Sequence, residues 1–278
     1  MRRLLVCIEG DVPSANMRDS LLSMSRWEEA PPTDEDRYFV NGDTTMVSTP
    51  NTHIYADDIN MRAEKAGFPV DEVVFMSKHA AASGEPALTV HPIGNFHESK
   101  FGGRAERLVP AAPASMTSAL RLISSYNTMP EFKVCFEVTH HGPWLSKPTF
   151  FIEIGSDERN WPNKKAADVL AKVLTDCEPS DYPVAAGVAG GHYAPRFTEI
   201  ALGYKVNIGH MLPNYHLEGR DDADVARMME AACAASGTDL VYIHRKSLKG
   251  PEERRIKDIA QSLGKETITS ADLDLLGF

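Results

Sequence analysis

Short apolar runs alternate with amphipathic stretches along most of the chain, and this alternation predicts an α/β fold. The apolar runs predict strands at 3–9, 72–77, 87–91, 132–139, 148–155, 183–188, 205–209 and 240–244. The amphipathic stretches predict helices at 14–24, 115–127, 162–176, 195–202 and 221–236, and a last helix that begins at Pro251. We therefore expect a mixed, largely parallel sheet with helices on both faces, in a single domain spanning residues 1–278.

Charge adds one candidate feature to this picture. The 278 residues carry a net charge of −10, which argues against a whole surface devoted to nucleic acid but leaves room for a local basic patch. Between positions 245 and 257, six basic residues stand against Glu252 and Glu253. They are Arg245, Lys246, Lys249, Arg254, Arg255 and Lys257. Taken alone, this segment is typical of an ordinary solvated helix.

Composition also excludes several classes of protein. No apolar run approaches the roughly 18–20 residues of a membrane span, and the run that follows Arg3 is too short for a secretory signal. The four cysteines stand far apart and form no C-x-x-C pair, so neither a disulfide framework nor a zinc finger is predicted. We expect a reduced, cytoplasmic protein with no membrane association.

Seven of the ten histidines lie at or just beyond the C-terminal end of a predicted strand. Ligands bind at that edge in open α/β sheets, so the pattern favours a shared site. The alternative is that polar residues simply begin where strands end. The seven are His79, His91, His140, His141, His192, His210 and His244.

Two single carboxylates, Glu137 and Glu153, stand inside apolar runs. A buried carboxylate must be paired, metal-bound or protonated, unless it lies on an edge strand and faces solvent. Histidine nitrogen and carboxylate oxygen suit zinc with water in an open position. The H-E-x-x-H, G-x-S-x-G, P-loop and G-x-G-x-x-G motifs are absent, so such a site would be assembled from separate strands.

Six short motifs carry most of these residues. In order, they are S-K-H (Ser77–His79), H-P-I-G-N (His91–Asn95), E-V-T-H-H-G-P (Glu137–Pro143), F-I-E-I-G-S (Phe151–Ser156), G-G-H-Y-A-P-R-F (Gly190–Phe197) and G-H-M-L-P (Gly209–Pro213). Together they resemble the D-aminoacyl-tRNA deacylase family of the archaeal-and-plant type. The resemblance spans nearly the whole chain, as far as Lys246–Gly250.

The resemblance implies a three-layer α/β/α sandwich of the phosphorylase/hydrolase type. It also implies a zinc-dependent hydrolase that cleaves the ester joining a D-amino acid, D-tyrosine among others, to the 3′ end of tRNA. The expected zinc ligands lie among His79, His91, His141, His210 and Glu153, and His192 is a further candidate. We expect a monomer whose partner is the aminoacylated 3′ end of tRNA.

The remaining site residues follow from the same resemblance. We expect Glu137 to be the general base, with His140 and His192 as further catalytic groups, and Lys78 to hold the terminal phosphate or the oxyanion. The residues expected to contact the substrate are Asn95, Gly190, Gly191 and Arg196, and the six basic residues between 245 and 257 would bind tRNA.

Three alternatives stay open at this point. A metal-free enzyme could use a histidine base, or the substrate's own ribose hydroxyl, to activate water. A metal-dependent exopeptidase or amidase could carry a similar histidine and glutamate cluster on a related fold. A tRNA-binding module without catalysis would keep the basic patch and lose nothing when the histidines are replaced.

Overall fold

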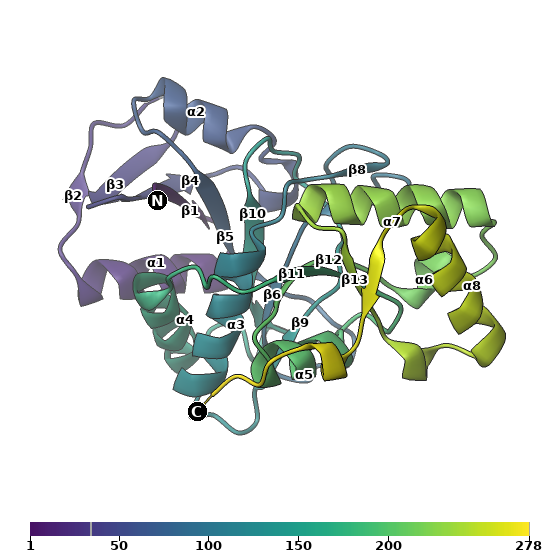
Figure 1. Cartoon of the computed structure of the whole chain (residues 1–278). Coiled ribbons are helices and arrows are strands. Elements are labelled where there is room, and N and C mark those ends of the chain that lie inside the picture. The colour runs from purple at the N-terminus through teal and green to yellow at the C-terminus, as the bar shows by residue number, and fades with distance from the viewer. Residues whose placement is uncertain (34, 278) are drawn as a thin grey trace.

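The computed structural model describes residues 1–33 and 35–277, and it shows an α/β protein with two principal sheets (Figure 1). The larger sheet has the order β2 (Glu28–Glu29), β3 (Arg37–Asn41), β4 (Thr44–Thr49), β1 (Arg3–Ile8), β5 (Glu72–Lys78), β10 (Thr149–Gly155), β6 (Ala87–His91) and β9 (Lys133–Phe136). The smaller sheet has the order β12 (Asn207–Leu212), β11 (Val184–Val188), β13 (Leu240–Ile243) and β14 (Glu266–Ile268). A short ladder joins β7 (Gly94–Asn95) to β8 (Arg107–Leu108).

Most strand pairs in the two principal sheets are parallel. The smaller sheet is parallel throughout, and in the larger one the antiparallel pairs are β2 with β3, β3 with β4, and β10 with β6. The predicted mixed, mostly parallel arrangement is therefore confirmed, although the strands are divided between two sheets.

Helices cover both faces of each sheet. Alternate residues of β1, β5 and β10 pack against α1 (Val12–Met24), α3 (Pro113–Tyr126) and α4 (Lys164–Asp176), and the intervening residues pack against α2 (Ile59–Lys65). The smaller sheet packs against α7 (Asp222–Ser236) and α8 (Gly250–Ser262) on one face and against α5 (Pro195–Gly203) on the other. This layering confirms the expected α/β/α sandwich. Short helical turns complete the fold: α6 (Asn214–Leu217), η1 (His53–Tyr55), η2 (Arg245–Ser247) and η3 (Ser270–Asp272).

Local sequence signals account for several element ends. Side chains of Asp11, Asn163 and Asp221 accept hydrogen bonds from the first turns of α1, α4 and α7. Gly42 has a φ of 58° between β3 and β4, which the Asn41-Gly42 pair predicts for a hairpin. The described residues include no helix long and apolar enough to cross a membrane.

The ends of β9 and β12 lie furthest from the predictions, and the hydrogen-bond partners of the residues concerned explain both. β9 ends at Phe136 because the next residues bond to the smaller sheet's side of the molecule: Val138 N–H donates to the His192 carbonyl and Thr139 N–H to the Met211 carbonyl. β12 continues to Leu212 because Met211 and Leu212 pair with β11. Segment 137–141 therefore bridges the two sheets.

Candidate active site and metal-binding cluster

The site lies on the bridge between the two sheets rather than at one sheet edge. Glu153 stands in the middle of β10, while His79 follows β5 and His91 ends β6. β5 is parallel to β10 but β6 is antiparallel to it, so the two histidines approach Glu153 from opposite directions. The expectation of a single shared carboxyl edge is therefore wrong for this pair, although their side chains do meet.

Glu137 lies at the centre of the cluster, and its side chain has no exposed surface. Its Oε1 lies 3.1 Å from His79 Nδ1, and its Oε2 lies 2.9 Å from His192 Nε2 and 3.7 Å from His140 Nε2. Burial alone would raise the pKa of this carboxyl group. Hydrogen bonds from His192 and His79 outweigh burial and hold the pKa well below its usual range, so Glu137 is ionised at neutral pH.

His79 connects the two carboxylates. Its Nδ1 lies 3.9 Å from Glu153 Oε2 as well as near Glu137, and its Nε2 lies 2.9 Å from the hydroxyl of Tyr193. The Trp161 indole N–H donates to the His79 carbonyl at 2.8 Å. Burial lowers the pKa of His79, but the hydrogen bond that its Nδ1–H donates to Glu137 and the charges of both carboxylates outweigh burial and raise that pKa.

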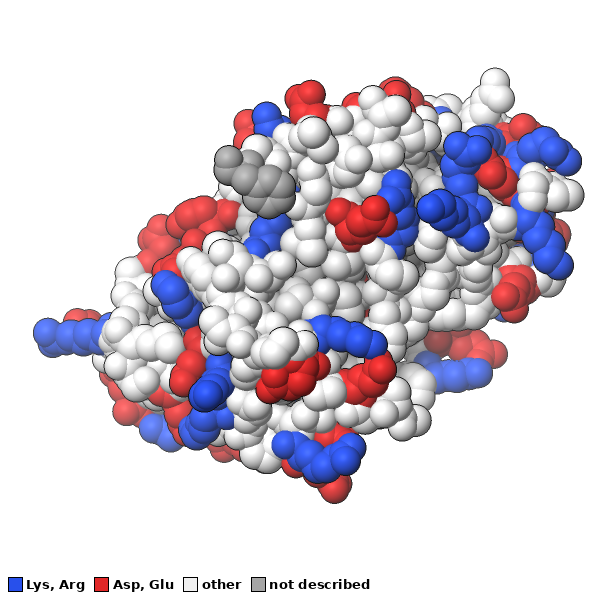
Figure 2. Space-filling view, turned by 90° about the horizontal axis from the view of Figure 1, so that it is seen from below, with Lys and Arg blue, Asp and Glu red and all other residues white. Residues whose placement is uncertain are grey.

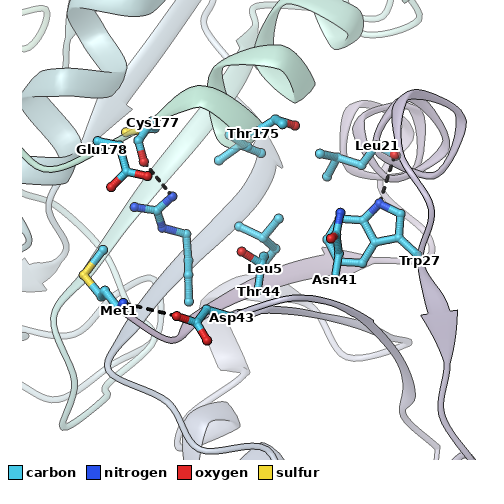
Figure 3. A pocket seen from close by; sticks show the side chains of 12 residues that line it. Met1, Leu5, Leu21, Trp27, Asn41, Asp43, Thr44, Thr175, Cys177 and Glu178 are labelled. Atoms are coloured by element: carbon cyan, nitrogen blue, oxygen red, sulfur yellow. Dashed lines mark hydrogen bonds and ion pairs between the residues drawn. The ribbon is translucent and has the colours of Figure 1, made fainter.

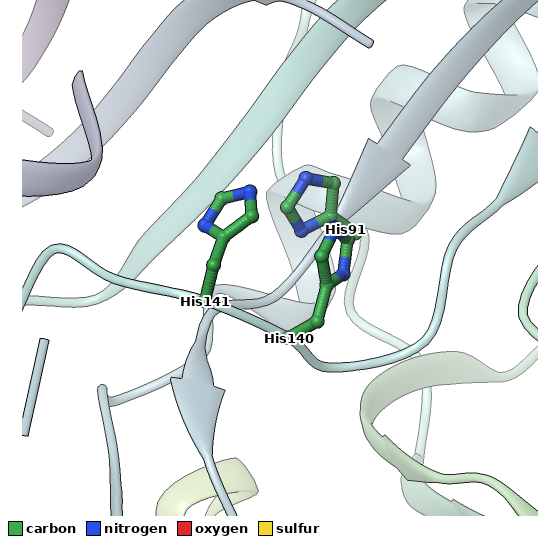
Figure 4. Close-up of side chains that lie close together, drawn as sticks. All are labelled: His91, His140 and His141. Carbon is green, nitrogen blue, oxygen red and sulfur yellow. The ribbon is translucent and has the colours of Figure 1, made fainter. Parts of the chain in front are cut away.

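Three histidine rings lie close together near these carboxylates: His91 stacks on His140, and His141 lies edge-on to both (Figure 4). Each places Nδ1 within 3.1 Å of a backbone carbonyl, those of Pro92, Val138 and Gly142. A carbonyl only accepts, so Nδ1 carries the proton in each ring and the Nε2 lone pair is left for another partner. This is how metal-bound histidines are usually oriented.

The electrostatics of these histidines differ. Burial lowers the pKa of His140 to about 3 and that of His141 well below its usual value, and neighbouring histidines add to both shifts. Both are therefore neutral, which is the form that binds metal. His91 Nε2 lies 3.4 Å from Glu153 Oε2, and although burial opposes it, this carboxylate raises the pKa of His91.

The donor set fits a divalent cation held by nitrogen and oxygen. Three overlapping groups have ligand atoms within 4.8 Å of one another: His91 with His140 and His141, Glu137 with His140 and His192, and His79 with Glu137 and Glu153. His91 Nε2 and Glu137 Oε1 are also buried without a well-aligned hydrogen bond. Buried polar atoms left in this state are what a bound cation would satisfy.

These groups include the predicted ligands His79, His91, His141 and Glu153, but not His210. His210 lies inside β12 rather than after a strand, and it is fully buried. Its Nε2 donates to the Val109 carbonyl at 2.8 Å, and its Nδ1 accepts from the Thr139 hydroxyl at 3.0 Å. Both ring nitrogens are thus used within the protein, and burial lowers the pKa of His210 to about 4.

Lys78 and Asn95 occupy supporting positions. Lys78 ends β5 directly before His79, and its ammonium group lies 4.8 Å from the ring centroid of Trp161. The Asn95 amide donates to the carbonyls of Gly102 and Arg104 at 3.0 and 3.3 Å. Its donor group therefore holds the loop that follows β7.

Of the predicted substrate contacts, Gly190 and Arg196 already bind other groups of the protein, whereas Gly191 is exposed. Gly190 N–H donates to Asn214 Oδ1 at 2.8 Å, so it has no free N–H for an oxyanion, whereas Gly191 is exposed with open space around its Cα. Gly190 also packs closely on His244: a Cβ added there would lie 2.9 Å from the imidazole Nδ1. Arg196 binds the Tyr242 hydroxyl at 2.7 Å and pairs with Glu199 at 2.8 Å.

The basic segment is partly neutralised. Figure 2 shows Lys and Arg gathered at the end of the molecule where α8 lies, with acidic side chains among them. Glu253 pairs with Arg245 at 2.5 Å and with Lys257 at 2.7 Å, while Arg255 pairs with Asp222 and Glu252. The other three, Lys246, Lys249 and Arg254, are exposed, and the described residues supply no ion pair to them.

Sequence reasoning did not single out two residues that belong to the site. Tyr193 contacts His79, and His53 lies in η1 with its ring 6.3 Å from that of His141. Tyr193 directly follows His192, so the prediction of His192 as a site residue could also have pointed to Tyr193. No signal in the sequence marks His53, because its approach depends on how η1 packs against Phe151.

A separate cavity of about 310 Å³ opens at the other end of the larger sheet, near the start of β1 (Figure 3). Its polar groups bind one another: Arg3 pairs with Glu72 at 2.8 Å and donates to the Cys177 carbonyl, and the Met1 amino group lies 3.6 Å from Asp43. Glu72 begins β5 and His79 follows its end, so the strand's length separates this cavity from the cluster. Its charges are used in holding the fold.

Comparison with known proteins places the chain in a family. The family model described as D-aminoacyl-tRNA deacylase matches residues 66–268. A Methanosarcina mazei protein of that name is 34% identical over 97% of this chain and 92% of its own length, and one from Arabidopsis thaliana is 32% identical over 96% and 97%. A Methanococcoides burtonii protein of the same name is longer: this chain is 34% identical to it but covers 57% of its length.

A solved structure has the same fold as this chain. The crystal structure of a conserved protein of unknown function, AF0625, has a TM-score of 0.88 and 32% sequence identity, and the match covers 99% of this chain and 98% of that one. The family model and the full-length relatives agree with the resemblance carried by the six motifs. The chain belongs to the D-aminoacyl-tRNA deacylase family.

Proposed function

We propose that this protein hydrolyses the ester bond of D-aminoacyl-tRNA at the cluster centred on Glu137. The observation that carries the proposal is the pairing of Glu137, which has no exposed surface, with His192, whose side chain is 37% exposed, at 2.9 Å. A buried carboxylate that orients a solvent-facing imidazole is the arrangement that general base catalysis requires. Family membership supplies the substrate class.

We assign the role of general base to His192 rather than to Glu137. Glu137 cannot reach water because it is fully buried, whereas His192 can. Glu137 is ionised, so His192 Nε2 donates to it, and His192 Nδ1 then carries the lone pair. The described residues place no hydrogen-bond partner on His192 Nδ1. His192 takes the proton from the attacking water, and Glu137 orients the imidazole and stabilises the imidazolium.

Zinc is the cation we assign to the cluster, since neutral imidazoles and carboxylates are its usual ligands. His91, His140 and His141, with the carboxylates of Glu137 and Glu153, would hold it. When bound, it would polarise the ester carbonyl and lower the pKa of water. His79 has its Nδ1 beside Glu137 and its Nε2 beside Tyr193, so it holds the Glu137 carboxylate in position.

The tRNA would reach the site across the loop that carries His192. Gly190 of this loop packs on His244, which lines a cavity of about 430 Å³ together with Arg196, Arg245 and Lys246. This continuity supports a phosphate path from the exposed basic residues of the 245–257 segment to the cluster. Lys78 directly precedes His79, and we assign it to holding the terminal phosphate or the oxyanion.

Both sheets contribute to the site, which supports the proposal of one catalytic domain. Segment 137–141 bonds to the smaller sheet's side while Glu153 belongs to the larger sheet, and one hydrophobic core contains residues of both, such as Ile152 and Met211. We place this domain in the cytoplasm, acting on aminoacyl-tRNA as a monomer.

The test is incubation with matched D- and L-tyrosyl-tRNA, with and without a chelator. We expect release of D-tyrosine, little release of L-tyrosine, and loss of activity on chelation that zinc restores. Hydrolysis that survives complete metal removal would contradict the zinc assignment. Cleavage of peptides with no effect on D-tyrosyl-tRNA would overturn the proposed function in favour of a peptidase.

A further inference from the structure

A second cavity, of about 410 Å³, adjoins the cluster through Tyr193. Its walls come from β6, β9 and the start of α5, with Ala87, Val134, Cys135 and Pro195 as the apolar lining. Ligand pockets for small molecules typically have volumes of about 300–1,000 Å³, so the cavity is large enough for one amino-acid side chain. We call it the side pocket.

Tyr193 is the wall shared by the side pocket and the cluster. Its hydroxyl lies 2.9 Å from His79 Nε2, and its ring centroid lies 5.6 Å from that of His79 and 5.4 Å from that of His192. Cys135 also joins the two, since it lines the side pocket and lies two residues before Glu137 on the same chain segment. The side pocket is therefore separated from the reacting groups by a single aromatic ring.

The lining indicates which chemistry would enter. Glu85 and Lys133 are the charged residues of the side pocket; both are more than half exposed, and they form an ion pair with each other. Neither charge is available without breaking that pair. Thr198 also lines the cavity, but its hydroxyl is already used, accepting from Phe136 N–H and donating to the Ala194 carbonyl. A neutral apolar or aromatic group can enter without leaving a buried charge unpaired.

We propose that the side pocket receives the amino-acid side chain of the substrate and selects bulky neutral side chains over small or anionic ones. This inference rests on the proposed function, because it takes the cluster as the place where the ester is cleaved. The ester carbon then lies beside His192, and the side chain extends past Tyr193 into the cavity.

The first test fills the cavity. Val134 is half-buried on β9, the edge strand of the larger sheet, so Val134→Trp places bulk in the side pocket without opening the core. We expect kcat/KM for D-tyrosyl-tRNA to fall about tenfold or more, the range that apolar pocket contacts supply, while D-alanyl-tRNA is far less affected. Met61→Trp, at a 55% exposed position on α2, is the matched control and should change neither rate.

The second test leaves the fold alone. Glu85→Lys changes an exposed rim residue and replaces the ion pair by two cations. D-aspartyl-tRNA should then gain on D-tyrosyl-tRNA by about tenfold in relative kcat/KM, because an anionic side chain now meets opposite charge.

The possible outcomes distinguish a failure of the side-pocket inference from a failure of the proposed function. If the unaltered enzyme hydrolyses D-tyrosyl-tRNA and both variants leave all three substrate ratios unchanged, the side-pocket inference is overturned and the proposed function stands. An equal loss for every substrate in Val134→Trp, with unchanged ratios in Glu85→Lys, also overturns it. If the unaltered enzyme hydrolyses none of the substrates, the proposed function fails and the inference fails with it.

Discussion

The three histidines His91, His140 and His141 occupy positions in the sequence like that of His210 but differ from it in how their ring nitrogens are used. His91, His140 and His141 each spend Nδ1 on a backbone carbonyl and turn Nε2 toward their neighbours. Both ring nitrogens of His210 form hydrogen bonds, one with the Val109 carbonyl and one with the Thr139 hydroxyl. Burial and strand position therefore do not identify a functional histidine. A ring nitrogen that has no hydrogen-bond partner and faces other potential ligand atoms does.

The two regions also differ in what they do for the fold. His210 ties β12 to Val109 and to Thr139, and the Thr139 hydroxyl in turn accepts from Met211 N–H. Thr139 directly precedes the histidine pair of the cluster. His210 thus positions the bridge between the sheets, while the cluster presents donors to a ligand.

The largest expected effect is at His192, the exposed member of the cluster. His192→Ala removes the proposed base, and such losses typically cost about 10²–10⁴-fold in rate. Single-turnover hydrolysis of D-tyrosyl-tRNA measures this. The melting temperature should change less than the rate, because the side chain is 37% exposed and water can enter the space it leaves beside Glu137. A destabilised variant that keeps full activity would remove His192 from the catalytic machinery.

His210→Ala should show the opposite pattern. It leaves the Val109 carbonyl and the Thr139 hydroxyl without their partner in the core, at a cost of about 1–3 kcal/mol for each unsatisfied group. Denaturant unfolding should show this loss, with a rate loss much smaller than that of His192→Ala. Unchanged stability together with lost turnover would make His210 a ligand, as the sequence predicted.

The dependence of the unfolding free energy on acidic pH tests the same contrast between His210 and the cluster. Burial holds the pKa of His210 at about 4, whereas an unfolded chain takes up that proton near pH 6.5. The unfolded state therefore binds more protons between these values, and stability falls as the pH drops from about 6.5 toward 4. Replacing the imidazole in His210→Gln should flatten this part of the curve of unfolding free energy against pH. An unchanged slope would mean that His210 does not stay neutral.

The smallest expected effect concerns the basic patch, where some side chains already form ion pairs and others do not. Arg255 is already paired with Asp222 and Glu252, whereas Lys249 has no ion pair with a described residue. Lys249→Ala should reduce the slope of log tRNA affinity against log salt by roughly 0.7–0.9. Arg255→Ala should reduce it by less. Equal slopes for both variants and the unaltered protein would place the tRNA elsewhere.

The parts of the structure that depend on nearby residues were predictable. β6 has the predicted bounds, and α5 begins at Pro195 as predicted. The end of β9 and the position of His210 inside β12 were not, because both depend on bonds between distant segments. Thr139 and His210 lie 71 positions apart, and Val109 lies 101 positions from His210.

The candidate site was predictable in its membership more than in its roles. Five of the six motifs supply Glu137, Glu153 and the histidines of the cluster, whereas the sixth carries His210, which does not belong to it. Full burial of Glu137 and exposure of His192 decide which of them can meet water, and neither property is visible in an apolar run. The antiparallel placement of β6 against β10, which lets His79 and His91 meet at Glu153, also depends on pairing that periodicity does not reveal.

The central claim is that the three-histidine group and its carboxylates bind a cation while His210 does not, and zinc binding measured by equilibrium dialysis tests it most directly. The unaltered protein and His210→Ala should both retain zinc. His141→Ala should bind it at least about tenfold more weakly, because even the partners of a metal ligand are worth that much. Zinc binding that survives in His141→Ala and is lost in His210→Ala would contradict the account.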